Sequence, residues 1–316
     1  MSEHFILSSR IHEKSSETLL QYLVRKFRYF DEPAWRDRIS DGRITVNERP
    51  ASAGQVLRKG DSVAYATGAW CEPPVNTDYR TLFEDETFLV LSKPAPLPVH
   101  SIGAYFQNTL MSLLRRDRPE ARDFNLVHRL DRETSGVLLL CKKKGLLGPL
   151  QAAWREGKVR KEYRAIVFGD FRPDRRRVDA AIGRALNSRI RMKLGVDHVR
   201  GRSSVTEFEV LDRRKGHSML KVNPLTGRTH QIRVHLETLG HPIVGDKLYS
   251  GEDATFLEFL EHGWTEKLAA KVRLPRLALH AMRLELPHPV SGESLVFEDS
   301  LPKELQEFWT SLDRAV

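Results

Sequence analysis

Residues 126–140 read LVHRLDRETSGVLLL, in which basic, acidic and hydroxyl side chains pass directly into an apolar run. The apolar half predicts a buried strand, since short aliphatic runs are typical of strands covered on both faces. Gly136 allows the chain to turn tightly into that strand. Catalytic groups are often found on loops that such strands anchor. His128, Asp131 and Ser135 are therefore candidates for chemistry, and the plainer alternative is a solvated loop.

Several enzyme motifs fail on spacing in this stretch. A protein-kinase catalytic loop requires His-Arg-Asp in succession, but Leu130 separates Arg129 from Asp131. A G-x-S-x-G nucleophile elbow at Ser135 would need a glycine where the sequence has Glu133. A phosphate-binding G-x-x-x-x-G-K-[ST] loop does not occur in the chain. Residues from elsewhere in the chain must therefore complete any chemistry of this stretch.

A second dense stretch, PLTGRTHQIRVHLETLGHPIVGD, covers residues 224–246. Apolar residues at helical spacing predict a helix that begins at Thr229. Arg228, His230 and Arg233 then cluster around its N-terminus, where the helix dipole and free amides favour anions. We expect His230 to hydrogen-bond a phosphate group or the backbone.

The sequence offers no convincing metal or cofactor site. His230 and His235 would lie about 140° apart on a helix, a poor arrangement for one metal ion, and H-E-x-x-H is absent. The two cysteines, Cys71 and Cys141, are far apart and outside any C-x-x-C. We expect neither a metal nor a cofactor.

The bulk composition points to a polyanionic partner. Lys+Arg number 51 against 42 Asp+Glu in 316 residues, a net charge of +9 with a pI near 9.6. Such an excess favours nucleic acid. Few cysteines, no signal-peptide apolar region and no apolar run near the ~20 residues of a membrane span predict a cytoplasmic protein. We also expect a monomer.

The chain divides into three predicted segments: an N-terminal domain at 1–72, a proline-containing linker at 73–79 and a larger domain at 80–316. The first contains two predicted helices and a small hairpin. In the larger domain, neighbouring strands joined by short turns favour antiparallel or mixed pairing over a doubly wound parallel sheet. We predict an α+β fold with a central mixed, mainly antiparallel sheet flanked by helices.

Several ordered segments together resemble the RluA-type pseudouridine synthases, over nearly all of residues 80–312. The matching segments are LVLSKPAPLPVH (89–100), HRLDRETSG (128–136), KEYRA (161–165), GRTHQIRVHL (227–236), GHPIVGDKLYSG (240–251) and LALHAMRLELPHP (277–289). The N-terminal domain resembles an S4-type RNA-binding module through DGRITVNERP (41–50) and KGDSVAY (59–65). It departs from that pattern at Ala34-Trp35-Arg36, where a Ser-Arg pair is usual.

The resemblance implies the pseudouridine synthase fold and a reaction. The family isomerises uridine in RNA to pseudouridine: the N1–C1′ bond breaks, the uracil turns and C5 bonds to C1′. Asp131 would be the catalytic aspartate, as nucleophile or general base, and Arg233 would pair with it and orient it. Tyr163 would stack near the base and assist proton removal, although a strand tyrosine on its own is usually a core or rim residue. Arg129 would occupy the space that the flipped uridine leaves.

Phosphate contacts must supply much of the remaining affinity. We expect His128, Arg228 and His230 to contact RNA beside the catalytic loop. The run RIRMK at 189–193 lies in a predicted loop-like insertion, so Arg189, Arg191 and Lys193 are further candidates. RPDRRR at 172–177 is as readily a solvated face.

Two alternatives to the enzyme remain open, as does the substrate. One is a catalytically inactive RNA-binding protein with an S4 module and a decayed synthase domain. The other is a metal-dependent nuclease, in which Asp131 and Glu133 would have to belong to a Mg²⁺-binding cluster. The S4-like module favours ribosomal RNA, whereas the loop PVHSIGAYFQNTL (98–110) resembles members that act on transfer RNA.

Overall fold

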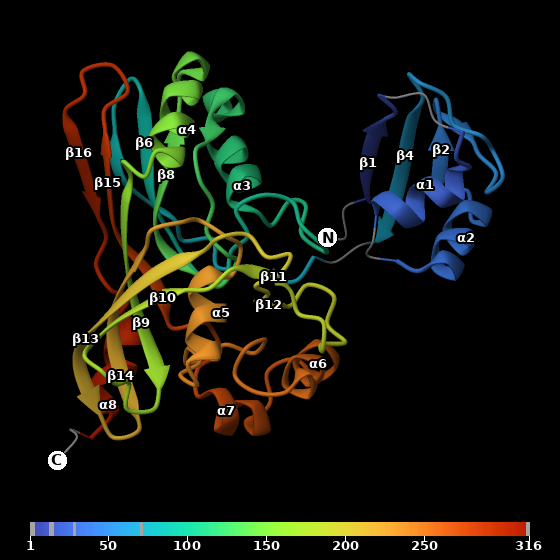
Figure 1. The fold of residues 1–316 in the computed structure, drawn as a ribbon. Coiled ribbons are helices and arrows are strands. Elements are labelled where there is room, and N and C mark those ends of the chain that lie inside the picture. Colours follow the sequence, from blue (N-terminus) through green and yellow to red (C-terminus); the bar gives the residue numbers. More distant parts are fainter. Residues whose placement is uncertain (1–3, 13–15, 28–29, 70–71, 314–316) are drawn as a thin grey trace. The chain divides into compact units, whose positions relative to one another are not determined.

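The computed structural model describes residues 4–12, 16–27, 30–69 and 72–313 (Figure 1). The chain divides into two compact units, one of Met1–Pro74 with Ser101–Gln107 and one of Val75–His100 with Asn108–Val316. Each unit has its own sheet and apolar core. Cys71 lies outside the described residues.

The first unit contains both predicted helices, α1 (Leu19–Lys26) and α2 (Glu32–Ser40). Thr18 and Gln21 form a reciprocal capping box at the start of α1. An antiparallel sheet completes the unit in the order β1 (His4–Arg10), β4 (Ser62–Ala69), β2 (Ile44–Val46) and β3 (Arg49–Pro50). The strand β1 was not predicted.

Trp35 explains why this unit departs from the expected Ser-Arg pair on its second helix. Its side chain is 0% exposed and stacks edge-on against Tyr65 at 5.3 Å and Phe30 at 5.1 Å. Residue 35 therefore packs in the core of the unit and is not part of its surface.

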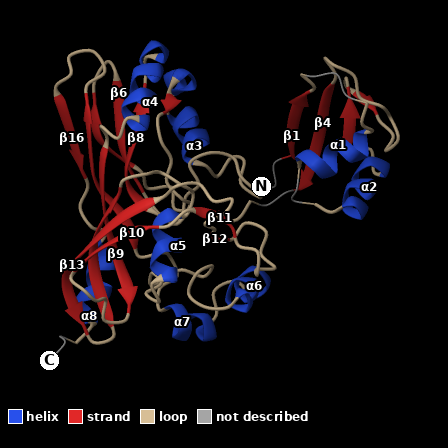
Figure 2. Cartoon of the chain, in the orientation of Figure 1, coloured by secondary structure: helices blue, strands red, loops and turns tan. Residues whose placement is uncertain are grey.

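The second unit is built on a mixed sheet, ten-stranded within the described residues (Figures 1 and 2). Its main path runs β10 (Arg175–Asp179), β13 (Val205–Arg214), β14 (His217–Pro224), β9 (Arg160–Phe168), β15 (Leu279–Pro287), β8 (Ser135–Cys141), β6 (Phe88–Lys93) and β5 (Arg80–Glu84). Off this path, β16 (Ser294–Glu298) pairs with β15 and β7 (Asn125–Leu126) with β8. Among the described pairs, β8 with β15 is parallel and the others are antiparallel. The predicted mixed, mainly antiparallel sheet is confirmed.

Helices cover both faces of this sheet around β6 and β8, whose residues are all buried. Alternate residues of a strand point to opposite faces. Leu89 and Leu138 therefore belong to the core that includes α3 (Leu110–Asp117), while Val90 and Leu139 belong to the core that includes α4 (Leu147–Arg155). This double coverage accounts for the uninterrupted apolar run in GVLLLC.

The remaining helices and short elements complete the unit. Helices α5 (Gln231–Thr238) and α8 (Lys303–Ser311) pack into the core of β9, β13 and β14. The others are α6 (Asp253–His262), α7 (Glu266–Val272) and the 3-10 turns η1 (Pro119–Asp123) and η2 (Lys144–Leu146). No helix in the described part of the chain is long and apolar enough to cross a membrane.

Two basic runs are more ordered than the sequence suggested. Arg175 and Arg177 lie on β10 and form cross-strand ion pairs with Glu209 and Glu207 of β13. The expected loop-like insertion instead contains a small antiparallel pair, β11 (Ile182–Arg184) and β12 (Leu194–Val196). The segment 185–193 is therefore the connection of a hairpin.

Candidate active site

A pocket of about 310 Å³ lies where the loop before β8, the strand β9 and the start of α5 meet. Its volume falls at the lower end of the range usual for small-molecule sites. The residues that line it are 127–131, Thr134, Trp154, Lys161, Tyr163, Pro224, 226–233 and Leu279. The two densest polar stretches of the sequence therefore meet at one cavity.

The loop that carries Asp131 is held from both sides. Leu130 is buried in the core beneath α3, and the Thr134 amide donates to the Asp131 carbonyl at 3.2 Å. The next carbonyl, that of Arg132, accepts from the Leu97 amide at 2.8 Å and from the Lys93 ammonium at 3.3 Å. These contacts fix the backbone on either side of Asp131.

Gly136 ends this loop at a point that has no room for a side chain. Its φ is +116°, and a Cβ there would lie 2.2 Å from the carbonyl oxygen of Ala281. The reason is the parallel pairing of β8 with β15, which places Ala281 opposite Gly136. The glycine is thus needed for a close approach of two strands as well as for the turn.

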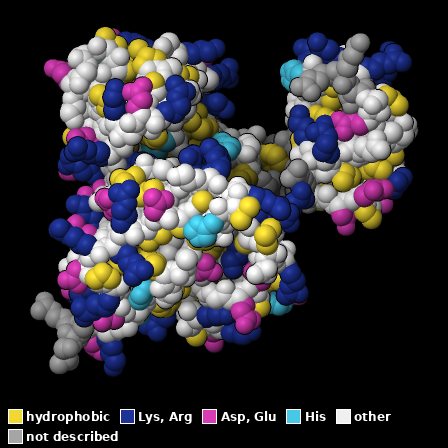
Figure 3. All heavy atoms as spheres, in the orientation of Figure 1, with side chains coloured by type: hydrophobic (Ala, Val, Ile, Leu, Met, Phe, Trp, Pro, Cys, Tyr) yellow, Lys and Arg dark blue, Asp and Glu magenta, His cyan; other side chains and the backbone are white. Residues whose placement is uncertain are grey.

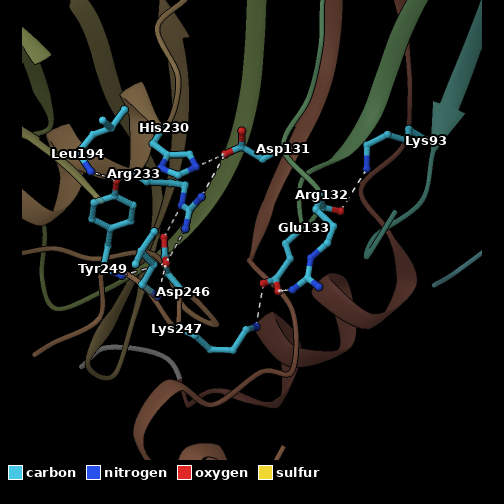
Figure 4. Close-up of polar contacts among 11 residues, drawn as sticks. Lys93, Asp131, Arg132, Glu133, Leu194, His230, Arg233, Asp246, Lys247 and Tyr249 are labelled. Carbon is cyan, nitrogen blue, oxygen red and sulfur yellow. Dashed lines mark hydrogen bonds and ion pairs between the residues drawn. The ribbon is translucent and has the colours of Figure 1, made fainter. Parts of the chain in front are cut away.

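Arg233 binds two carboxylates at once (Figure 4). Its Nη1 donates to Asp131 Oδ2 at 3.2 Å, while Nε and Nη2 donate to the two oxygens of Asp246 at 2.7 and 3.0 Å. Asp246 is 1% exposed and also accepts the amides of Leu248 and Tyr249. The expected contact between Asp131 and Arg233 is present, and Asp246 holds the arginine in place.

Asp131 is ionised at neutral pH. Burial by itself raises the pKa of this carboxyl, but the charges of Arg233 and Arg129, joined by His230 once acid protonates it, more than offset burial and hold the pKa below its ordinary value. The two carboxylates raise the pKa of Arg233 in turn, against the effect of burial. The site therefore presents a negatively charged, partly exposed oxygen to the pocket.

Tyr163 faces the same cavity from β9. Burial, and then the negative charge of Asp131, raise the pKa of its phenol, so the hydroxyl stays protonated. Its neighbour Lys161 also lines the pocket and donates to the Thr226 carbonyl at 2.8 Å. Burial lowers the pKa of Lys161 to about 8, with a further contribution from the charge of Arg228.

The predicted RNA-contacting residues beside the loop fall into different environments. Arg129 is exposed at the pocket, and its guanidinium makes no hydrogen bond to another described residue. Arg228 lines the pocket and donates to the Ser203 carbonyl at 3.0 Å. His128 stacks on Trp154 at 5.3 Å, and its Nε2 accepts the Leu139 amide at 3.0 Å. That edge of the His128 ring therefore serves the fold.

The three candidates of the β11–β12 connection also differ. Arg189 and Arg191 are exposed. Lys193 is 8% exposed, and its ammonium lies 3.4 Å from a carboxylate oxygen of Asp253 on α6. The protein itself thus binds the Lys193 ammonium, which leaves it less available to a phosphate than the two arginines.

Four buried residues of the site were not singled out from the sequence: Lys93, Asp246, Lys247 and Tyr249. Lys93 is fully buried and donates to the Pro94 and Leu97 carbonyls as well as to that of Arg132. Lys93 lies in the matching segment LVLSKPAPLPVH, but a single lysine carries no periodic signal that would have marked it out within that segment. The segment GHPIVGDKLYSG did contain the other three, and its family resemblance was the available signal.

Glu133 does not join Asp131 in a metal-binding cluster. It pairs with Lys247 at 2.8 Å and with Arg132 at 2.6 Å. Within the described residues, no group of three or more His, Cys, Asp or Glu side chains is placed to hold a metal ion. The second acid that the nuclease alternative required is therefore committed to holding the loop.

Comparison with known proteins identifies the family to which this fold belongs. The model of the RNA pseudouridylate synthase family matches residues 87–238. Ribosomal large subunit pseudouridine synthase C of Pasteurella multocida is 38% identical over 311 residues, which are 95% of this chain and 91% of that protein. Ribosomal large subunit pseudouridine synthase D of Neisseria meningitidis is 33% identical over 276 residues, 84% of this chain and 71% of that protein.

A solved structure agrees with these sequence relatives. Human RNA pseudouridylate synthase domain containing 1 superposes with a TM-score of 0.56 at 26% identity, over 76% of this chain and 97% of that one. The predicted pseudouridine synthase fold is thereby confirmed for the larger unit, and the inactive alternative gains no support. This chain belongs to the RNA pseudouridylate synthase family and is an RNA pseudouridine synthase.

Proposed function

We propose that the protein isomerises a uridine of ribosomal large-subunit RNA and that Asp131 carries the reaction. The observation on which this rests is an ionised carboxylate in a pocket, held by Arg233 and faced by Tyr163. Relatives named for the ribosomal large subunit align over 84 to 95% of the chain and support the substrate class.

Asp131 is suited to attack C1′ or to stabilise positive charge there. An ionised carboxylate needs no prior deprotonation. Arg233 lowers the rotational freedom of Asp131 and keeps it charged, and Asp246 in turn holds Arg233. The negative charge is therefore oriented before the substrate arrives.

Tyr163 and Arg129 suit a flipped nucleotide. Taking the uridine out of its stack costs a few kcal/mol, and stacking on an aromatic ring returns roughly 1–3 kcal/mol per base. Tyr163 offers a ring inside the pocket, while Arg129 offers an exposed cation at its rim. Tyr163 would contact the base, and Arg129 would take the space that the base leaves.

RNA phosphates would be bound by exposed cations around this pocket. Arg189 and Arg191 on the β11–β12 connection and Arg228 at the pocket are our candidates, with His128 and Lys193 contributing from within the protein. Basic side chains are spread over the drawn face of each unit among acidic ones (Figure 3). The N-terminal unit would act as an S4-like RNA-binding domain, 1–72, joined by the linker 73–79 to the catalytic domain 80–316.

Chemical mapping of pseudouridine tests both parts of this proposal. RNA from cells lacking the protein should lose pseudouridine at one or more large-subunit positions, and wild-type protein should restore it. The Asp131→Asn variant should bind RNA but restore nothing. Loss confined to transfer RNA would reject the ribosomal substrate, and full activity of Asp131→Asn would reject the catalytic assignment.

A further inference from the structure

His230 begins α5 in a conformation that few residues other than glycine adopt. Its φ is 57° and its ψ is 14°, in the left-handed region. Residues held in such conformations cluster at functional sites, where their surroundings determine them. Here the imidazole lines the pocket and lies between Tyr249 and Asp131 (Figure 4).

The hydrogen bonds of Tyr249 assign the protonation of this ring. The Leu194 amide donates to Tyr249 Oη at 3.1 Å, and His230 Nδ1 lies 2.9 Å from the same oxygen. Tyr249 is 1% exposed, and within the described residues its hydroxyl has no other hydrogen-bond partner. The phenolic proton therefore needs Nδ1 as its acceptor, because a buried hydroxyl is rarely left without one.

A neutral imidazole carries one N–H group, so this contact places the proton of His230 on Nε2. Nε2 lies 4.0 Å from Asp131 Oδ2, too far for a direct hydrogen bond. Within the described residues, Nε2 has no hydrogen-bond partner. Its N–H thus points into the pocket on the side of Asp131 and is left for a ligand.

The surrounding charges keep the ring neutral. Burial, followed by the charges of Arg233 and Arg129, lowers the pKa of His230 to about 4, although Asp131 and Asp246 act in the opposite sense. Tyr249 packs edge-on against the His230 ring, and the Lys193 ammonium lies 5.7 Å from the centre of the Tyr249 ring. At neutral pH the imidazole of His230 is therefore uncharged, and it donates a hydrogen bond from Nε2 and accepts one at Nδ1.

We propose that His230 is a catalytic residue that donates its Nε2–H to the bound uridine, and that Tyr249 is the positioning residue that holds this tautomer. The inference rests on the proposed role of Asp131, because the donor faces the space beside that carboxylate. The matching acceptors are the carbonyl oxygens of uracil, which gain negative charge as the electron pair of the N1–C1′ bond moves onto the base. His230 neither gains nor loses a proton, which separates this role from general base catalysis.

Nitrogen NMR of the full-length protein labelled at histidine tests the tautomer without reference to activity. The signal of His230 is identified by its disappearance in His230→Gln. We expect an unprotonated Nδ1 and a protonated Nε2 at pH 7, and a loss of this preference in Tyr249→Phe. A wild-type Nδ1–H tautomer would overturn the proposal.

Steady-state kinetics test the role in the reaction. Tyr249→Phe keeps the ring beneath the Arg233 guanidinium, which lies 4.8 Å from its centroid, and removes one oxygen. We expect kcat to fall about tenfold with KM little changed, the loss of one hydrogen bond to developing charge. Tyr79→Phe, which removes a hydroxyl bonded to Asp117 outside the pocket, is the matched control and should retain wild-type rates.

Substitutions of His230 distinguish a donor from a base. Gln keeps an N–H near the position of Nε2 but cannot titrate, so His230→Gln should retain most of the activity and the wild-type pH profile. His230→Ala should lose about tenfold. Equal loss in both variants would overturn the donor role. If Asp131→Asn were fully active the proposed function itself would fail, whereas an inactive Asp131→Asn with an unaffected Tyr249→Phe would reject this inference alone.

Discussion

Arg233 is bound more closely to Asp246 than to Asp131. Two short hydrogen bonds, of 2.7 and 3.0 Å, join it to Asp246, and one of 3.2 Å joins it to Asp131. Asp246 is buried and belongs to the turn before Tyr249, so the guanidinium is fixed from the protein side. Asp131 therefore meets a cation whose position does not depend on the substrate.

Asp246→Asn should lower kcat about 10- to 100-fold with little change in KM. Asn retains an oxygen for the two backbone amides but removes the charge that holds Arg233, and small displacements of positioning groups cost this much. The free energy of unfolding should also fall, by about 3 kcal/mol, because a buried guanidinium loses a partner. Steady-state kinetics and urea unfolding measure the two effects.

Asp299→Asn is the control for that variant. Asp299 is also buried, with 6% exposure, and pairs with Arg80 and Ser92, but it does not line the pocket. It should lose stability and keep kcat. Equal loss of kcat in both variants would show that general destabilisation, rather than the position of Arg233, explains the effect.

Lys247→Met should loosen the loop that carries Asp131. Lys247 is 4% exposed, and its ammonium donates to Glu133 at 2.8 Å and to the Pro275 carbonyl at 2.9 Å. Removing it leaves Glu133 with Arg132 alone, at a cost of about 3–5 kcal/mol for a broken buried pair. Denaturant unfolding should show that Lys247→Met with Glu133→Gln recovers part of this loss, since the double-mutant cycle isolates the pair. Strict additivity would contradict the coupling.

Gly136→Ala should prevent folding of the second unit or destabilise it by several kcal/mol. The added Cβ would meet the Ala281 backbone at 2.2 Å, at a φ that L-residues rarely adopt. Gly145→Ala in η2, where a Cβ meets nothing within 4 Å, should instead keep stability or raise it by up to about 0.5–1 kcal/mol. Thermal unfolding of the two variants compares them, and similar melting temperatures would argue against the close approach of β8 and β15.

His128 should make stability depend on pH. Burial, with a smaller contribution from the charge of Lys161, lowers the pKa of its ring from 6.5 to about 3. Below pH 6.5 the unfolded chain therefore takes up a proton that the folded protein does not, so stability falls as the pH falls from 6.5 towards 3. Between pH 7 and 5 this should amount to about 1–2 kcal/mol for His128.

Urea unfolding at the two pH values measures this loss, with His128→Gln as the comparison. Gln can still accept the Leu139 amide but does not titrate. The variant should lose less stability between pH 7 and 5 than the wild type. An identical pH dependence would mean that His128 titrates in the folded protein.

The sequence by itself determined the family and the mixed sheet, and it named the candidate groups of the site. The structure brings Asp131, Tyr163 and Arg233 to one pocket. They come from three separate stretches, which are LVHRLDRETSGVLLL, KEYRA and GRTHQIRVHL, respectively. The resemblance of ordered segments to a known family named these three residues, whereas apolar periodicity and turn glycines, which are local features of the sequence, predicted the strands. They also predicted neighbouring strands joined by short turns, as in the β13–β14 and β15–β16 hairpins.

Tertiary structure alone decided how these groups are held. Lys93 and Lys247 support the loop that carries Asp131, Asp246 fixes Arg233, and Tyr249 faces His230. These arrangements depend on contacts between residues that are 13 to 114 positions apart in the sequence. The same holds for Gly136, whose necessity comes from Ala281 on a parallel strand. No local pattern records such pairings, because burial and the absence of water around a charge arise only when distant segments pack together.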